Sequence, residues 1–215
     1  MKPRVKICCI GSVAEMWLAV RYGASAVGLI SAMPSGPGVI ADELIKEIAA
    51  EVPPGVASFL LTCQTNAAEI IAQQRTMRTN TLQLCDRLER GTHRDLRAAL
   101  PGVALVQVIH VQSEASVDEA LRVAPEVDAL LLDSGNQQLA IKELGGTGRT
   151  HDWRLSRRIV EQAGKPVFLA GGLKPENVRA AIEAVQPYGV DVCSGLRPDG
   201  RLDERKLAAF FAQVN

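Results

Sequence analysis

The sequence predicts an α/β fold, a single closed (β/α)8 TIM barrel that takes in residues 1–215 as one domain. Three observations predict it. Eight apolar runs of strand length alternate with amphipathic runs of helix length. No linker or low-complexity stretch divides the chain, and 215 residues is an ordinary length for one such barrel. A doubly wound open sheet is the alternative, but the first turn, CCIGSVAE, lacks the GxGxxG fingerprint.

Each predicted strand is a short, largely apolar run, and most of the runs end in Gly, Ser, Thr or Cys. In chain order the predicted strands are 5–10, 26–31, 56–62, 81–85, 104–111, 129–134, 166–171 and 189–195. The runs between them have apolar residues at three- and four-residue spacings, as in ADELIKEIAAEV, NAAEIIAQQ and PENVRAAIEAV, and DERKLAAFFAQV closes the chain as the last helix. The connection from residue 135 to 152 is long, which is typical of a functional loop.

The composition excludes several classes of protein. Lys plus Arg and Asp plus Glu are equal at 24 each, so no charge footprint indicates nucleic acid or an anionic membrane. Five cysteines without a CxxC pair argue against a disulfide framework or a zinc ribbon, and predict reduced thiols. The first apolar run is too short for a signal peptide or a membrane span. We therefore expect a cytoplasmic protein that acts on a small molecule.

The first strand, VKICCI, has a lysine and two cysteines in a segment that otherwise reads as buried. Alternation along a strand places Lys6, Cys8 and Ile10 on one face and Cys9 on the other. A lysine cannot face the helix-packed layer cheaply, so Lys6 is expected to point into the barrel, with Cys8 above it near the carboxyl end. Cys9 is expected to pack beneath the helices as a small hydrophobe.

Polar residues also end or interrupt later strands. In ALLLDS, Asp133 shares a face with Ala129 and Leu131 at the carboxyl end of the strand, where barrels of this kind carry their chemistry. A capping aspartate is the alternative reading of Asp133. In GVDVCSG, Asp191 and Cys193 share a face, and the sequence also places Gln83 and Gln107 within otherwise apolar strands.

Three glycine-rich turns follow the last three strands. They are GGTG at 145–148, AGG at 170–172 and SGL at 194–196. Glycines allow backbone amides to approach an anion closely, and the loops after strands seven and eight are the usual phosphate site of this fold. Each glycine taken alone could equally be a plain turn residue.

With VKICCI, YGASAVGLI, LLLDS, GGTGRTHDW, LAGGLKPENVRAAI and GVDVCSG, the chain resembles the phosphoribosylanthranilate isomerase family of tryptophan biosynthesis over nearly its whole length. The resemblance implies a cofactor-free and metal-free isomerase that converts a phosphoribosylamine into a 1-amino-1-deoxyribulose phosphate. It implies that Cys8 is the general base and Asp133 the general acid. Substrate would be bound by the residues Gly146, Gly171, Gly172, Asp191, Ser194 and Gly195.

The chain departs from the family pattern in loops that would line the substrate. The family has Ser-Pro-Arg after the second strand, where the arginine binds the anthranilate carboxylate, but this chain has Ser35, Gly36 and Pro37. Arg149 and Arg197 are the candidate replacement cations. The substitution pair Gly36→Pro/Pro37→Arg, which restores Ser-Pro-Arg, is expected to raise kcat/KM and to be a better variant than Pro37→Arg alone. Other departures are Cys9 for glycine, Cys85-Asp86 for His-Gly, and Arg197 for an acidic residue.

Two functions follow from this pattern. The first is an isomerase of a phosphorylated sugar, working as a monomer or homodimer without nucleic acid or membrane partners. The second is a paralogue that binds or senses another phosphorylated sugar without turnover. Retention of both Cys8 and Asp133 favours the enzyme, because a pure binder does not need an acid–base pair. Loss of the arginine favours an altered ligand.

Overall fold

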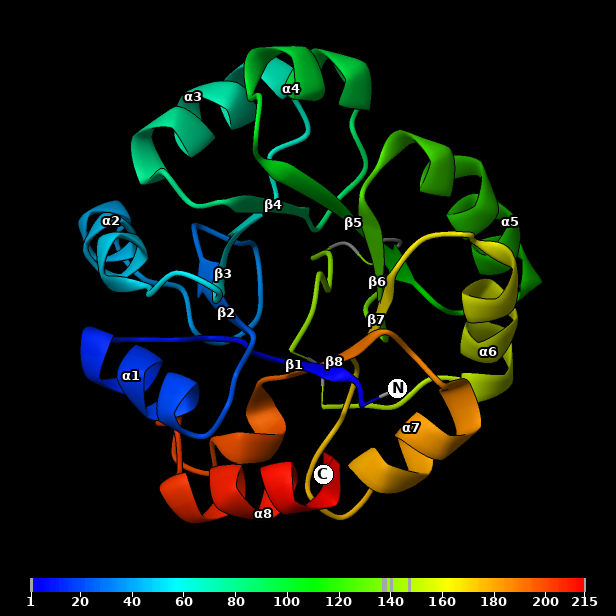
Figure 1. The fold of residues 1–215 in the computed structure, drawn as a ribbon. Coiled ribbons are helices and arrows are strands. Elements are labelled where there is room, and N and C mark those ends of the chain that lie inside the picture. The colour runs from blue at the N-terminus through cyan, green and yellow to red at the C-terminus, as the bar shows by residue number, and fades with distance from the viewer. Residues whose placement is uncertain (1, 137–138, 140, 147, 215) are drawn as a thin grey trace.

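The computed structural model describes residues 2–136, 139, 141–146 and 148–214. Over these residues eight parallel strands close into a barrel in the order β1-β2-β3-β4-β5-β6-β7-β8, and α-helices surround it (Figure 1). The (β/α)8 prediction is therefore confirmed. Thr147 of the GGTG turn lies outside the described residues.

All eight predicted strands are present, and most are shorter at the carboxyl end than the apolar runs indicate. They are β1 Arg4–Ile7, β2 Ala26–Ile30, β3 Ala57–Thr62, β4 Thr81–Leu84, β5 Ala104–His110, β6 Ala129–Asp133, β7 Val167–Leu169 and β8 Gly189–Val192. The barrel closes where β1 pairs with β8, with Lys6 opposite Asp191.

The helices are α1 Val13–Arg21, α2 Asp42–Glu51, α3 Ala67–Met77, α4 His93–Ala99, α5 Glu114–Val123, α6 Trp153–Gln162, α7 Val178–Val185 and α8 Glu204–Val214. Two short 3₁₀ turns, η1 Ala124–Glu126 and η2 Ser194–Leu196, follow α5 and β8. Side chains cap several amino termini; Ser12, for example, accepts a hydrogen bond from the Glu15 amide, which fixes where α1 begins. Within the described ranges, no helix combines the length and apolar character that crossing a bilayer requires.

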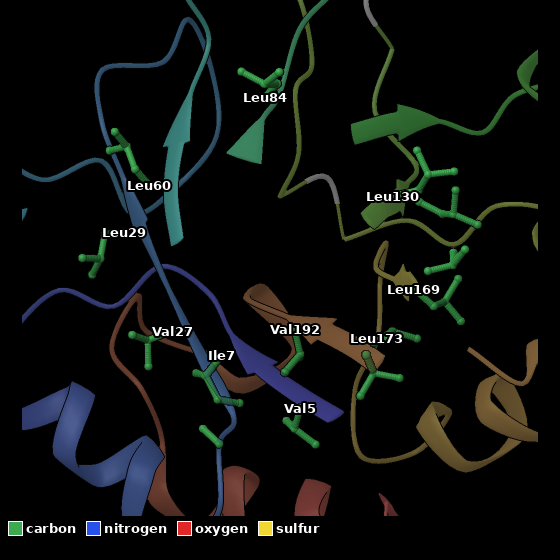
Figure 2. Close-up of a cluster of buried hydrophobic side chains, with 14 of the residues drawn as sticks. Val5, Ile7, Val27, Leu29, Leu60, Leu84, Leu130, Leu169, Leu173 and Val192 are labelled. Carbon is green, nitrogen blue, oxygen red and sulfur yellow. The ribbon is translucent and has the colours of Figure 1, made fainter. Parts of the chain in front are cut away.

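Alternation along the strands produces two separate apolar clusters. Outward side chains such as Val5, Ile7 and Leu130 pack under the helices, and Figure 2 shows part of this layer. Inward side chains such as Phe59, Val108 and Leu131 fill the barrel. This burial, mostly of aliphatic residues, is the main source of stability, and it leaves the carboxyl ends of the strands for polar groups.

The predicted face of Ile10 is wrong, although those of Lys6 and Cys8 are confirmed. Ile10 lies in the outer cluster with Val5, whereas Cys8 lies in the inner one. The reason is local: β1 ends at Ile7, and Cys9 adopts a left-handed conformation with φ of 62°, which breaks the two-residue alternation.

Candidate active site

A pocket opens at the carboxyl ends of the strands, the end at which barrels of this kind carry their chemistry. Seven of the nine site residues predicted from the sequence line it: Cys8, Asp133, Gly146, Gly171, Gly172, Asp191 and Ser194. Gly195 and Arg149 are not among its lining residues. The lining residues come from the carboxyl ends of the strands and from the loops that follow them, which is how the barrel gathers residues distant in sequence.

The Cys8 side chain is buried and occupies space that a glycine provides. A Cβ added at Gly28, on the neighbouring strand β2, would lie 2.7 Å from Cys8 Sγ and 3.1 Å from Lys6 Nζ. Burial raises the pKa of the Cys8 thiol to about 11, and the nearby Lys6 ammonium opposes this shift only in part. Desolvation of the Cys8 thiol thus outweighs the stabilisation of its thiolate by Lys6.

Lys6 lies one pleat below Cys8 and is completely buried. Its Nζ donates to Asp191 Oδ2 at 2.9 Å and lies 5.2 Å from the centre of the Phe59 ring. Burial alone would lower the pKa of Lys6, but Asp191, and to a smaller extent Cys8, raise it above its ordinary value. The second carboxylate oxygen, Asp191 Oδ1, is buried and accepts no hydrogen bond from the described residues. That oxygen can therefore accept a hydrogen bond from a ligand.

Asp133 ends β6 on the same face as Ala129 and Leu131, as predicted. Its Oδ1 accepts a hydrogen bond from the Ser134 amide at 2.7 Å, and the side chain is 8% exposed. Gly145 comes close from the loop after β6, because a Cβ there would lie 3.0 Å from Asp133 Oδ2. Asp133 therefore combines a local capping contact with a place in the pocket wall.

The turns after β7 and β8 bring backbone to the pocket with little side-chain cover. Gly171 and Gly172 have φ of 81° and 62°, a left-handed conformation that favours glycine. A Cβ at Gly172 would lie 2.7 Å from the Arg149 carbonyl carbon, so the loop after β6 packs directly on this turn. Gly195 has a packing role, since a Cβ there would lie 2.0 Å from the Leu173 carbonyl oxygen.

Two of the five cysteines are not the reduced thiols that the sequence predicts. Cys9 and Cys193 form a disulfide, with their Cα atoms 5.8 Å apart. Cys9 therefore does not pack beneath the helices; both sulfurs belong to residues that line the pocket. The prediction failed because the two residues are separated by 184 positions and meet only when β1 and β8 close the barrel.

The two candidate replacement cations lie elsewhere. Arg149 forms an ion pair with Glu143, and its side chain is 60% exposed. Arg197 is buried, pairs with Glu15 at 2.9 Å and donates to the Cys8 carbonyl oxygen at 3.3 Å. The Arg197 side chain therefore supports the scaffold on which the carboxyl end of β1 rests.

The loop between β2 and α2 covers one side of the pocket with uncharged residues. Met33, Ser35, Gly36 and Pro37 line the pocket, and among the described residues that do so there is no lysine or arginine. Gly36 has φ of 100°, which proline cannot adopt, so the structure argues against the expectation that Gly36→Pro/Pro37→Arg is a better variant than Pro37→Arg.

The sequence marks Gln83 only as a polar interruption of a strand, yet its side chain lines the pocket and its Oε1 accepts no hydrogen bond from the described residues. Gln107, a similar interruption, is bonded to the carbonyl oxygens of Leu84 and Asp86. The signal that separates the two glutamines is the alternation of side chains along a strand, because it places Gln83 on the inward face of β4 and Gln107 on the outward face of β5. No group of His, Cys, Asp or Glu side chains in the described part of the chain could hold a metal ion.

Comparison with known proteins bears on this arrangement. Residues 5–213 match the family model described as N-(5'phosphoribosyl)anthranilate (PRA) isomerase. A curated N-(5'-phosphoribosyl)anthranilate isomerase of Methanocella arvoryzae is 33% identical over 98% of this chain and 96% of its own. A solved phosphoribosyl anthranilate isomerase in complex with reduced 1-(o-carboxyphenylamino)-1-deoxyribulose 5-phosphate is 27% identical, with a TM-score of 0.79 over 99% and 98% of the chains. A structure of monomers derived from the dimeric isomerase of Thermotoga maritima is 26% identical, with a TM-score of 0.80 over 99% and 98%.

Proposed function

Because the chain belongs to the N-(5'-phosphoribosyl)anthranilate isomerase family, we propose that it catalyses the family's Amadori rearrangement of a phosphoribosylamine to a 1-amino-1-deoxyribulose phosphate. One observation carries the proposal. A thiol and a carboxyl, Cys8 just after β1 and Asp133 at the end of β6, line a single pocket together with glycine turns able to hold a phosphate.

Binding is assigned to groups of residues that line the pocket. The backbone of Gly171, Gly172 and Ser194 would take the phosphate, since a glycine turn allows amides to approach anionic oxygens. The unpartnered acceptors Asp191 Oδ1 and Gln83 Oε1 suit sugar hydroxyls, which are hydrogen-bond donors. Placing the phosphate and the hydroxyls fixes the first two carbons of the sugar near the acid and the base.

The reaction then needs one acid step and one base step. Asp133 protonates the ring oxygen of the ribose, the bond from that oxygen to C1 breaks, and an iminium forms. The Cys8 thiolate removes the proton from C2 to give an enolamine, and the enolamine tautomerises to the ketone as C1 gains a proton. Atoms and electrons balance within one substrate, so no redox cofactor takes part in these steps.

Three further properties belong to the same proposal. The protein acts in the cytoplasm on a small phosphorylated sugar, with neither nucleic acid nor membrane as a partner. It works as a monomer or a homodimer, as the dimeric relative from Thermotoga maritima and the monomers derived from it suggest. Residues 1–215 act as one domain.

The test is turnover of phosphoribosylanthranilate by the purified protein and by Cys8→Ser and Asp133→Asn. Each substitution is expected to lower kcat/KM by roughly 10²-fold or more, because it removes a group that transfers a proton in the transition state. Cys63→Ser is the matched control, since Cys63 is a free cysteine that does not line the pocket.

Retained turnover in Cys8→Ser or Asp133→Asn would contradict the assigned role. An unmodified protein that binds the substrate without converting it would instead support the sugar-phosphate binder. The absence of a lysine or arginine among the described pocket residues is the observation that favours this second candidate.

A further inference from the structure

We propose that Cys9 and Cys193 form a redox-modification site at the rim of the pocket, where a dithiol–disulfide couple sets how firmly the phosphate turn is held against the end of β1. The proposal rests on the proposed function for its effect on catalysis. The dithiol–disulfide couple itself is tested by a thiol count, which does not depend on enzyme activity.

The disulfide joins the two residues next to the proposed binding and catalytic groups. Cys9 directly follows Cys8, and Cys193 directly precedes Ser194. The bond therefore makes a covalent path of four residues from the proposed base to the proposed phosphate turn. Below this path, hydrogen bonds of the β1–β8 pairing continue as far as the Cys8 amide, which donates to the Val192 carbonyl oxygen at 2.9 Å. The disulfide thus ties the strand ends together beyond the last of these bonds.

Cys9 also contacts the β2–α2 loop, which covers one side of the pocket. A Cβ added at Gly38 would lie 2.6 Å from the Cys9 Cβ, and Cys9 Sγ lies 3.8 Å from the Pro37 carbonyl oxygen. The disulfide has no proton to donate to that carbonyl, whereas the thiol does. Reduction therefore changes the contact of Cys9 with the β2–α2 loop as well as its bond to Cys193.

The two sulfurs differ in access. Cys9 is buried, whereas Cys193 is partly exposed, so an incoming thiolate reaches Cys193 first. Attack by a small dithiol forms a mixed disulfide with Cys193, and Cys9 leaves as a thiolate. The second thiolate of the reagent then displaces Cys193. The reductant becomes a cyclic disulfide, and its two protons end on Cys9 and Cys193.

The neighbouring thiols do not compete for this exchange. Cys8 and Cys85 are buried and take no part in the disulfide, and burial raises the pKa of both, so at neutral pH they are poor nucleophiles. Disulfides that occur in a reducing compartment are usually transient or redox-sensing. With the proposed cytoplasmic location, this pair is therefore a reversible site.

The first experiment counts thiols. The native protein is equilibrated with oxidised glutathione or with dithiothreitol, then denatured, alkylated and weighed by mass spectrometry. Three alkylations are expected after oxidation, because Cys8, Cys63 and Cys85 take no part in the disulfide, and all five cysteines are expected to react after reduction. Five alkylations in both samples would overturn the site. Three in both would overturn its reversibility.

The second experiment measures kinetics in both redox states. Reduction is expected to raise KM roughly three- to ten-fold and to change kcat less than about two-fold, because the turn that binds phosphate is less firmly placed while the acid and base remain. An unchanged KM would overturn the link to binding. A protein with no turnover in either state would refute the proposed function and leave the thiol count standing.

Variants separate the bond from the side chains. Cys193→Ser and Cys9→Gly should each show the KM of the reduced protein and no response to dithiothreitol, and glycine at position 9 keeps the left-handed backbone without cost. Cys63→Ser should keep the full response, since Cys63 is outside the pocket. Cys193→Ser with the KM of the oxidised protein would contradict the proposal.

Discussion

At the scale of single residues, the protonation of Cys8 is set by competition between burial and Lys6. Burial prevails and raises the pKa of the thiol to about 11, so at neutral pH most molecules carry the protonated form. If the thiolate is the base, the residual kcat/KM of Asp133→Asn, in which the acid no longer titrates, is expected to rise nearly ten-fold per pH unit between about pH 7 and pH 10, instead of reaching a plateau near the ordinary thiol pKa of about 8.5. A kcat/KM profile against pH measures this, and the second ionisation of the phosphate, near pH 6, lies outside the window.

Cys8→Ser/Asp133→Asn provides the comparison, because neither replacement titrates in this range and the residual activity should be flat. A plateau of Asp133→Asn below pH 9 would show that Lys6 outweighs burial when substrate is absent.

At the scale of elements, the β2–α2 loop decides which side chains can contact the anthranilate part of the substrate. Pro37 lines the pocket and packs on the loop after β6, since a Cβ at Gly146 would lie 2.5 Å from Pro37 Cδ. Pro37→Arg is expected to raise kcat/KM for phosphoribosylanthranilate by roughly one to two decades, the size of one charge-assisted pair with a carboxylate. Steady-state kinetics should show the gain mainly as a lower KM.

Val39→Arg is the matched control, because Val39 is on the same loop, exposed and outside the pocket. It should leave KM unchanged. Gly36→Pro/Pro37→Arg should perform worse than Pro37→Arg, because φ at Gly36 is 100°. A kcat/KM for the double variant above that of Pro37→Arg would show that this loop rearranges freely.

At the scale of the whole molecule, a largely buried ion pair supports the barrel where its first and last strands meet. Glu15 on α1 pairs with Arg197 after η2 and accepts hydrogen bonds from the Leu202 and Gly11 amides. Burial raises the pKa of Glu15, but hydrogen bonds from Arg197 and the amides prevail and lower it. Glu15→Gln is expected to reduce the free energy of unfolding by about 3 kcal/mol at pH 7, because it leaves the buried guanidinium uncompensated. Urea unfolding measures the change.

The pH dependence has a defined sign. A carboxyl whose folded pKa is lowered stabilises the protein above its unfolded pKa of about 4.3, and this stability is lost as pH falls through the folded value. The deficit of Glu15→Gln should therefore be complete at pH 7 and shrink below about pH 4.5. Arg157→Ala, which breaks an exposed pair with Glu161, should cost less than about 1 kcal/mol. Equal costs for the two variants would contradict the account of the buried pair.

The sequence by itself determined the alternation of strands and helices, the inward direction of Lys6, Asp133 and Asp191, and the glycine turns. These follow from local periodicity and from the cost of burying charge, which depend on neighbours in the chain. It did not determine where alternation stops, so Ile10 was placed on the wrong face; the left-handed φ of Cys9 decides that.

Only the tertiary structure decided the fate of residues whose partners are distant in the chain. The Cys9–Cys193 bond spans 184 positions, and Arg197 meets Glu15 across 182. Arg197, expected as a substrate cation, supports the scaffold instead, and Pro37 lies against Gly146 from another loop. Such contacts exist only once the barrel closes, because closure brings the ends of β1 and β8, and the loops after β2 and β6, to one rim. No local pattern in the sequence carries that information.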